Sequence, residues 1–345
     1  NTGHLTVGGV NGVLSGLRVT GASGQIELIS DNTITVNEAI AAPNDITLVG
    51  GGQIQLNAAV STTDAVRIST SGGVTQTASG PVTASEFGVR NSGTGNVVLD
   101  QGNLVTTFAA SNSANGGTIQ FTNASSLTVG TISSDGSLFA SKDGITTNTG
   151  NVTIITSGTM TIGTGAGQSI SAAGATVTLN AITGGVTESA GSIVNADKRL
   201  LQGAGTFSLV ESNTVGTLAA GILGSLDYND ADDLSIGTVG TTSGITTGDG
   251  LTTGGSVTIN AAGNLTVDQA ISTATGTGGL ISVTNATLNA ALTAGAGNIT
   301  LTGGGQDLII NVDQTSNTTI TYSATRDIII RATITANGGT SDIVL

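Results

Sequence analysis

Short apolar patterns return every twenty residues in the first part of the chain, and this repeat constrains the fold more than any other feature. The tripeptide at 26–28 (IEL) returns at 46–48 (ITL) and 66–68 (VRI), and the one at 34–36 (ITV) returns at 54–56 (IQL). The first and third residues of each are apolar, which is typical of a β-strand with one buried face. Short strands that recur at a constant interval indicate a solenoid, in which each repeat forms one turn.

The spacing also predicts which side chains touch. Three short strands in about twenty residues form one rung, and in a parallel stack the next rung lies about 4.8 Å above it. We therefore expect Ile26, Ile46 and Val66 to form one interior stack. A second stack is expected of Ile34, Ile54 and Val74. Clusters of Gly, Asn and Asp between the strands supply the turns.

The composition fits a narrow core of small aliphatic side chains. The chain has 54 Gly, no Cys, no Trp and only 2% aromatic residues, while its apolar residues are mostly Val, Ile, Leu and Ala. Large aromatic side chains normally dominate a compact core. The absence of cysteine excludes a disulfide scaffold and thiol chemistry.

Charge and hydropathy restrict the partners. The chain has 8 basic and 22 acidic residues, a net charge of −14. Because nucleic-acid binding needs a basic surface, we expect no nucleic-acid partner. No run of eighteen apolar residues occurs, so we expect no membrane insertion. The chain opens NTGHLTV without an initiator Met or a signal peptide, and we expect a segment or a processed part of a longer exported chain.

Longer phrases also repeat. GGVTQTASGPVTA at 72–84 matches GGVTESAGSIVNA at 184–196, and TVNEAI at 35–40 matches TVDQAI at 266–271. These phrases, together with GNLTVDQAI and GSVTINAAGNLTV, resemble the repeats of filamentous-haemagglutinin-type exoproteins. The resemblance implies a right-handed parallel β-helix exported by Gram-negative or related bacteria, often through two-partner secretion.

The predicted fold is all-β, a right-handed parallel β-helix that runs through residues 1–345 as a single continuous β-solenoid. Dividing the length by about 20 residues gives roughly 17 rungs, and at about 4.8 Å each they form a rod on the order of 80 Å long.

An enzyme is not expected. Some parallel β-helices cleave polysaccharides, and such sites need paired titratable groups in a cleft. The basic residues form only two local groups, Lys198 with Arg199 and Arg326 with Arg331. We predict no catalytic residues and no organic cofactor. An ice-binding array of outward threonines is a further alternative, but the Thr pairs shift between strands and charged residues interrupt them.

The densest acidic segment is the one metal-site candidate. Calcium binds several oxygen ligands on one flexible loop, and residues 226–234 (LDYNDADDL) offer Asp227, Asn229, Asp230, Asp232 and Asp233. The spacing departs from the EF-hand pattern and from the RTX nonapeptide, which favours a solvated loop between rungs over calcium.

Two functions remain open. The first is a non-enzymatic structural or adhesive rod of a bacterial surface or secreted protein, outside the cell. The second is a subunit of an extracellular filament or sheath, assembled end to end by strand stacking. The sequence leaves room for self-association through the solenoid ends and for cell-surface or matrix glycans as partners.

The calcium hypothesis has a direct test. If the acidic segment binds calcium, millimolar calcium will raise the melting temperature of the protein relative to EDTA, because a ligand of the folded state alone stabilises it. Equal melting temperatures in calcium and in EDTA would dispose of the site.

Overall fold

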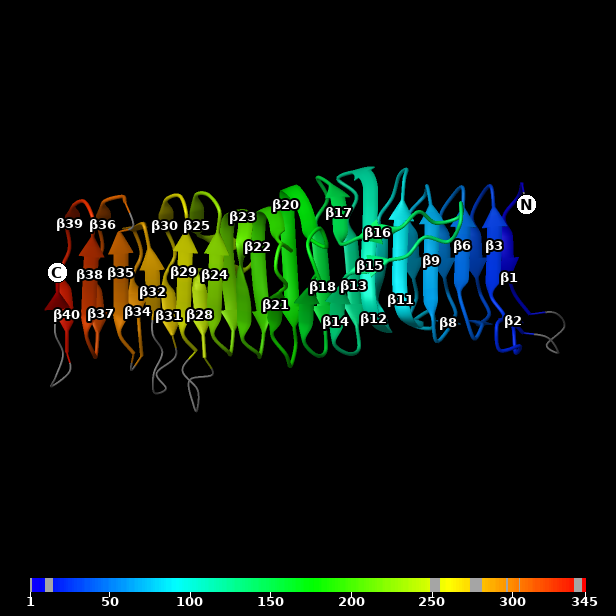
Figure 1. Cartoon of the computed structure of the whole chain (residues 1–345), viewed down its shortest axis with the longest axis horizontal. Helices are drawn as coiled ribbons and strands as arrows, with labels where there is room; N and C mark the ends of the chain where they lie inside the picture. Colours follow the sequence, from blue (N-terminus) through cyan, green and yellow to red (C-terminus); the bar gives the residue numbers. More distant parts are fainter. Residues whose placement is uncertain are drawn as a thin grey trace. The chain divides into compact units, whose positions relative to one another are not determined.

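A computed structural model describes residues 2–9, 15–248, 255–273, 281–295, 297–303, 305–337 and 343–345. Among these residues there is no helix, and none of them forms a helical segment long and apolar enough to cross a membrane. The chain winds into a β-solenoid of about 15 turns, roughly 21 residues apart, whose main sheets are parallel. Figure 1 shows successive strands side by side along the winding.

The inter-residue contacts divide the chain into two compact units. Unit 1 is Asn1–Thr176 and unit 2 is Val177–Leu345. The prediction of one continuous solenoid through residues 1–345 stays a prediction.

Short strands separated by turns make up unit 1. The strands that begin in it are β1 (Leu5–Val7), β2 (Leu17–Arg18), β3 (Ile26–Ser30), β4 (Ile34–Val36), β5 (Ile40–Ala41), β6 (Ile46–Gly50), β7 (Ile54–Leu56), β8 (Val60–Ser61), β9 (Ala65–Thr70), β10 (Val74–Gln76), β11 (Val82–Asn91), β12 (Val97–Asn115), β13 (Ile119–Asn123), β14 (Leu127–Val129), β15 (Thr131–Ile132), β16 (Lys142–Asp143), β17 (Ile145–Asn148), β18 (Val152–Thr156), β19 (Met160–Ile162) and β20 (Ile170–Ala181).

Unit 2 is built in the same way. Its strands are β21 (Val186–Glu188), β22 (Val194–Gly203), β23 (Phe207–Ile222), β24 (Leu226–Asp230), β25 (Leu234–Ile236), β26 (Thr238–Val239), β27 (Thr242–Ser243), β28 (Ile245–Thr247), β29 (Val257–Ala261), β30 (Leu265–Val267), β31 (Ile271–Thr273), β32 (Ile281–Thr284), β33 (Ala286–Leu288), β34 (Leu292–Thr293), β35 (Ile299–Gly303), β36 (Leu308–Ile310), β37 (Gln314–Ser316), β38 (Ile320–Ala324), β39 (Ile328–Ile330), β40 (Ile334–Ala336) and β41 (Ile343–Val344).

The vertical neighbours predicted from the twenty-residue repeat are confirmed. Ile46 on β6 pairs in parallel with Ile26 on β3 and with Val66 on β9. The second predicted stack also forms, since β7 lies between β4 and β10 with Ile54 opposite Ile34 and Val74. Because these strands bond to the strands one rung away, a regular repeat in the sequence becomes a regular stack in space.

The core lies inside the coil of each unit. In β4 and β7 the first and third residues are buried and the middle one is half-buried, as the two-residue period of a strand requires. Val, Ile and Leu fill most inward positions, and Ile34, Ile54 and Val74 are fully buried. Each such side chain contributes about 1.5–3 kcal/mol by its burial.

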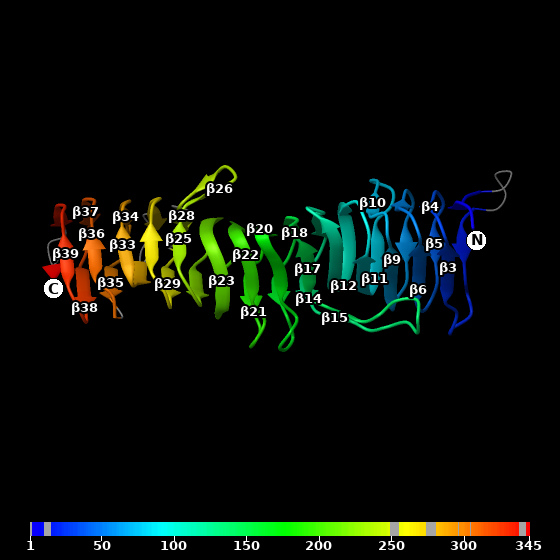
Figure 2. The same cartoon turned by 90° about the horizontal axis from the view of Figure 1, so that it is seen from above.

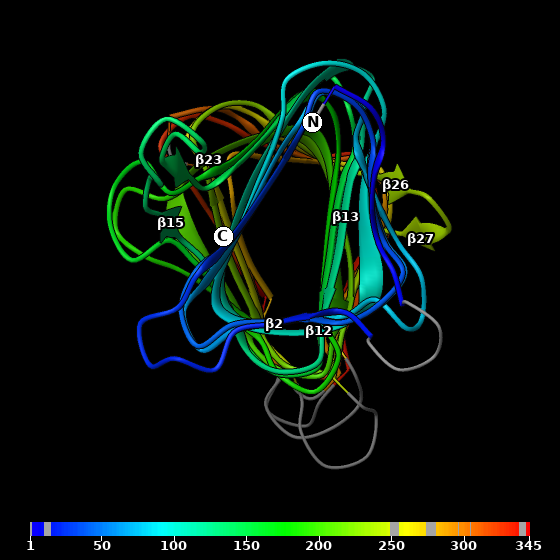
Figure 3. The same cartoon turned by 90° about the vertical axis from the view of Figure 1, so that its right-hand side faces the viewer.

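The number of turns is smaller than the predicted 17 because two rungs carry insertions. Ile119 pairs with Val152, 33 residues later, and Leu226 pairs with Val257, 31 residues later. The inserted residues include two antiparallel hairpins, β15–β16 in unit 1 and β26–β27 in unit 2. Figure 3 shows β15 and the β26–β27 pair outside the wall of coiled strands.

Candidate functional site

The acidic segment predicted as a calcium candidate is mostly a strand of the solenoid wall. Asp227, Asn229 and Asp230 belong to β24, in which Asp227 is exposed, Asn229 is half-buried and Asp230 is buried. Asp232 and Asp233 follow in the turn and are exposed. The strand therefore sends Asp227 and Asp230 to opposite faces, which the interpretation as a solvated loop did not anticipate.

The oxygens of this segment are engaged by protein groups. Asp232 N donates to Asp230 Oδ1 at 3.3 Å, and Asp233 Oδ1 accepts from Asn264 N at 2.7 Å. Asn260 Nδ2 donates to Asn229 Oδ1 at 2.7 Å. Within the part of the chain that the structure describes, no three His, Cys, Asp or Glu side chains are grouped as a metal site. Calcium binding stays an untested prediction.

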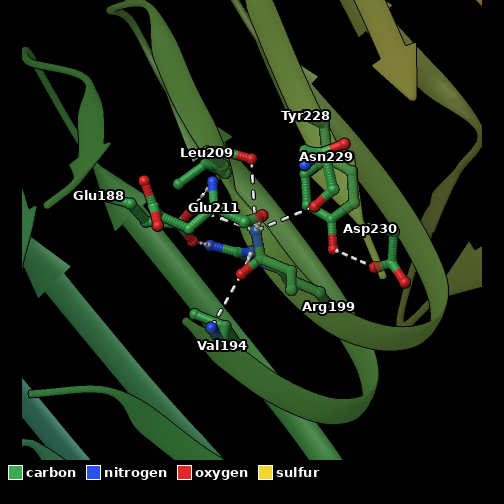
Figure 4. Close-up of polar contacts among 9 residues, drawn as sticks. Glu188, Val194, Arg199, Leu209, Glu211, Tyr228, Asn229 and Asp230 are labelled. Atoms are coloured by element: carbon green, nitrogen blue, oxygen red, sulfur yellow. Dashed lines mark hydrogen bonds and ion pairs between the residues drawn. The ribbon is translucent and has the colours of Figure 1, made fainter. Parts of the chain in front are cut away.

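The structure instead reveals a buried polar cluster in unit 2, formed by Glu188, Arg199, Asn213, Tyr228 and Asp230. Glu188 ends β21, Arg199 lies in β22, Asn213 in β23, and the last two in β24. Figure 4 shows the Arg199 side chain between Glu188 and the Tyr228 ring. Four consecutive strands thus each contribute to one charged group inside the wall.

Arg199 is the largest fully buried side chain in the cluster. Its Nη2 lies 3.4 Å from Glu188 Oε1, and both side chains are 0% exposed. Nη1 donates to Asn213 Oδ1 at 3.1 Å, and the guanidinium carbon is 5.5 Å from the centre of the Tyr228 ring. Its Nε makes no hydrogen bond. The ion pair is closed to solutes because neither partner reaches the surface.

Asn213 connects the cluster to the backbone of three consecutive rungs. Its Nδ2 donates to Glu188 Oε2 at 3.0 Å and to the carbonyl oxygens of Leu209 and Asn229 at 3.3 and 3.1 Å. Its Oδ1 accepts from Val194 N at 2.8 Å. One buried amide therefore satisfies backbone groups that the turn would otherwise leave unpaired, as buried polar groups require.

Burial is the main cause of the pKa shifts of the acidic side chains in this cluster. It raises the pKa of Glu188, an effect that the Arg199 charge and the hydrogen bond from Asn213 only partly offset. Burial also raises the pKa of Asp230 from 3.8 to about 7, and the neighbouring Asp232 adds to the increase. The pKa of Tyr228 is raised by burial as well, so its hydroxyl remains a donor to Asp230 Oδ2, at 3.0 Å.

Unit 1 contains the same arrangement without the charges. Asn103 Oδ1 accepts from Val82 N at 2.9 Å and from Gln76 Nε2 at 2.8 Å, while its Nδ2 donates to Leu99 O at 3.0 Å and Thr122 O at 3.0 Å. The strand pairings and the repeated phrases align Gln76 with Glu188 and Asn103 with Asn213.

Two other positions differ more between the clusters, because unit 1 has phenylalanine at both of them. The same alignment places Phe87 at the position of Arg199 and Phe121 at that of Tyr228. Phe87, Phe108 and Phe121 pack together, with centroids of the last two 3.9 Å apart in a stacked pair. The charged cluster of unit 2 therefore takes the places that Gln76, Phe87 and Phe121 hold in the core of unit 1, which is consistent with a structural role.

Sequence reasoning missed this cluster. It grouped Arg199 with Lys198 as a local basic pair, yet Lys198 is exposed and Arg199 is buried. The available signal was the match of residues 72–84 to residues 184–196, which sets Glu188 against Gln76.

Comparisons of the chain with protein-family models, with curated proteins and with solved structures find no match. The fold is consistent with β-helix repeat proteins, and the resemblance to filamentous-haemagglutinin-type repeats rests on the repeated phrases alone.

Replacing Asp230 with Asn, the residue at the equivalent position 123, should change how stability depends on pH. A group whose pKa is raised on folding contributes stability below its unfolded pKa and loses it as pH rises through the folded pKa. We expect Asp230→Asn to unfold like the parent protein at pH 4 and to be more stable at pH 8, by on the order of 2–4 kcal/mol. Denaturant unfolding at the two pH values measures this. A gain of equal size at both would contradict it.

Removing one partner of the ion pair should lower the free energy of unfolding, whereas replacing both partners with uncharged residues should change it much less. Arg199→Phe leaves Glu188 buried without its cation, and we expect a loss of about 3–5 kcal/mol at pH 7. The double variant Glu188→Gln with Arg199→Phe, which copies Gln76 and Phe87, should recover most of that loss because no uncompensated charge remains. Urea unfolding of the three proteins tests the pair, and a double variant no better than the single one would refute this interpretation.

Proposed function

We propose that this chain is a non-enzymatic structural and adhesive segment of a bacterial surface or secreted protein, located outside the cell. The observation that carries the proposal is that contacts on the inside and on the outside of the coils both join one rung to the next. Inside, aliphatic side chains stack from rung to rung. In such a stack the contacts between neighbouring rungs supply the stability of the whole coil.

The outer surface carries side-chain ladders that span several rungs. In unit 2, Asn289 donates to Asp268 at 2.8 Å, Asn311 donates to Asn289 at 3.0 Å, and Arg331 donates to Asn311 at 3.1 Å. In unit 1, Asn57 donates to Asn37 at 2.8 Å. Amide ladders of this kind stabilise stacked parallel strands, and they leave a surface of hydroxyl and amide groups that suits contact with glycans.

Turn residues add a second inter-rung bond. Asp313 Oδ1 accepts from Thr333 N at 2.7 Å, and Asn96 Oδ1 accepts from Thr118 N at 3.0 Å. Each acceptor lies about one rung before its donor. These contacts support a structural role, and the resemblance to filamentous-haemagglutinin-type repeats supports export to the cell surface.

The alternative is a subunit of an extracellular filament or sheath. One observation favours it: the rungs of this chain associate by parallel strand pairing, as β38 does with β35. A strand of a second copy can supply the same kind of pairing.

Electron microscopy of the purified chain separates the two functions. We expect single rods of uniform length that stay single as concentration rises, together with measurable retention on a glycan array or on cell-surface material. Continuous fibres would favour the filament instead. Uniform rods that bind no glycan and no matrix surface would remove the adhesive part of the proposal.

A further inference from the structure

The hairpin inserted in unit 1, here named the arm, spans Thr131–Asp143. Its strands β15 and β16 pair Thr131 with Asp143 and Ile132 with Lys142. At its base, Gly144 N donates to Gly130 O at 2.8 Å. Figures 1 and 2 show the arm leaving the coil next to β14 and running back along the outer face of unit 1 toward β6.

The arm follows a single outward column of residues. Thr47 on β6 pairs with Arg67 on β9, Arg67 with Gly88 on β11, and Gly88 with Ala109 on β12. The four residues lie above one another on successive rungs. Arg67 is 6% exposed and the Ala109 side chain is fully buried, although both lie on the outside of the coil. The arm is what covers them.

Polar contacts hold the far part of the arm. Thr47 Oγ1 donates to Asp135 Oδ2 at 2.5 Å, and Arg67 Nε donates to Ser133 O at 2.8 Å. Arg67 also forms an ion pair with Asp45 at 2.7 Å. The arm thus reaches two rungs that lie 60 or more residues earlier in the sequence.

An aromatic anchor holds the middle of the arm. Phe139 is 1% exposed and packs with Ile132 and Ala109 in one apolar cluster. A Cβ at Gly88 would lie 2.7 Å from Phe139 Cζ and 2.9 Å from Ile132 Cγ2. Phe139 is therefore seated in a space that exists only because residue 88 has no side chain.

Unit 2 has the same hairpin base with a much shorter hairpin. Gly237 N donates to Leu218 O and Gly244 N donates to Gly237 O, as Gly130 N does to Phe108 O and Gly144 N does to Gly130 O. Between its paired strands, unit 2 has only Gly240 and Thr241, where the arm has residues 133–141. A turn of two residues is sufficient at this place, so the longer arm must be explained by its contacts.

We propose that the arm is a strap that clamps four successive rungs of unit 1. While Phe139 is seated over Gly88, strands β6, β9, β11 and β12 open and close as one block. When Phe139 leaves, the block separates into individual rungs and uncovers the column from Thr47 to Ala109.

Hydrogen exchange of the whole chain tests the strap. In Phe139→Ala, we expect the backbone amides of β6 and β9 to exchange at least tenfold faster than in the parent protein, because local opening no longer requires the block to move. Amides of unit 2 should keep their rates. Ser69→Ala is the matched control, because this outward residue lies on β9 beside the column and should change nothing.

Two further variants keep the test decisive. In the first, residues 133–141 are replaced by Gly-Thr, the turn that unit 2 uses, and β6 and β9 should again exchange at least tenfold faster. In the second, Gly88→Ala should reproduce Phe139→Ala, and the two changes together should add little to either alone, since they remove one contact. Unchanged exchange in β6 and β9 for both Phe139→Ala and the shortened arm would overturn the proposal, even if the arm itself becomes sensitive to trypsin at Lys142.

Discussion

The parallel backbone ladder between rungs is the constraint on which the rest of the structure depends. It forces Ile26, Ile46 and Val66 above one another and fixes which residue of each strand faces inward. A one-residue slip in the pairing of a strand would turn its inward side chains to the outer face, because the side-chain period of a strand is two. The buried amides at the turns, such as Asn103 and Asn213, protect this register by bonding to backbone groups of neighbouring rungs.

Much of the fold could be predicted from the sequence because one rung corresponds to one repeat. The stacks at 26, 46 and 66 and at 34, 54 and 74 followed from counting alone. The number of turns was overestimated because a count by average length treats insertions as rungs. The arm gave no periodic signal, and its segment SSDGSLFAS reads as an ordinary loop. Only the match of the preceding residues, LTVGTI at 127–132 with LSIGTV at 234–239, indicates that two hairpins of different length lie at equivalent places.

The candidate site shows a different limit. The acidic run at 227–233 was interpreted by composition, whereas the alternation of the strand decides which carboxylates can meet. The same alternation separates Lys198 from Arg199. A prediction based on the two-residue period would have placed Arg199 and Asp230 inside, but not their partners, because Glu188 and Asn213 come from strands that only the register brings together.

The paired hairpin bases have a consequence for engineering. Gly144 has a φ of 61° and Gly244 one of 70°, and a Cβ at either would lie within 2.2 Å of a carbonyl oxygen one rung on. Each glycine lets the chain leave the sheet and rejoin it while Ala110 or Ala220 still donates to it. The same junction carries a turn of two residues in unit 2 and one of nine residues in unit 1. The short turn of unit 2 is accordingly a graft point, at which a foreign epitope or enzyme can be displayed on the solenoid wall, whereas the arm of unit 1 must stay in place to hold its rungs together.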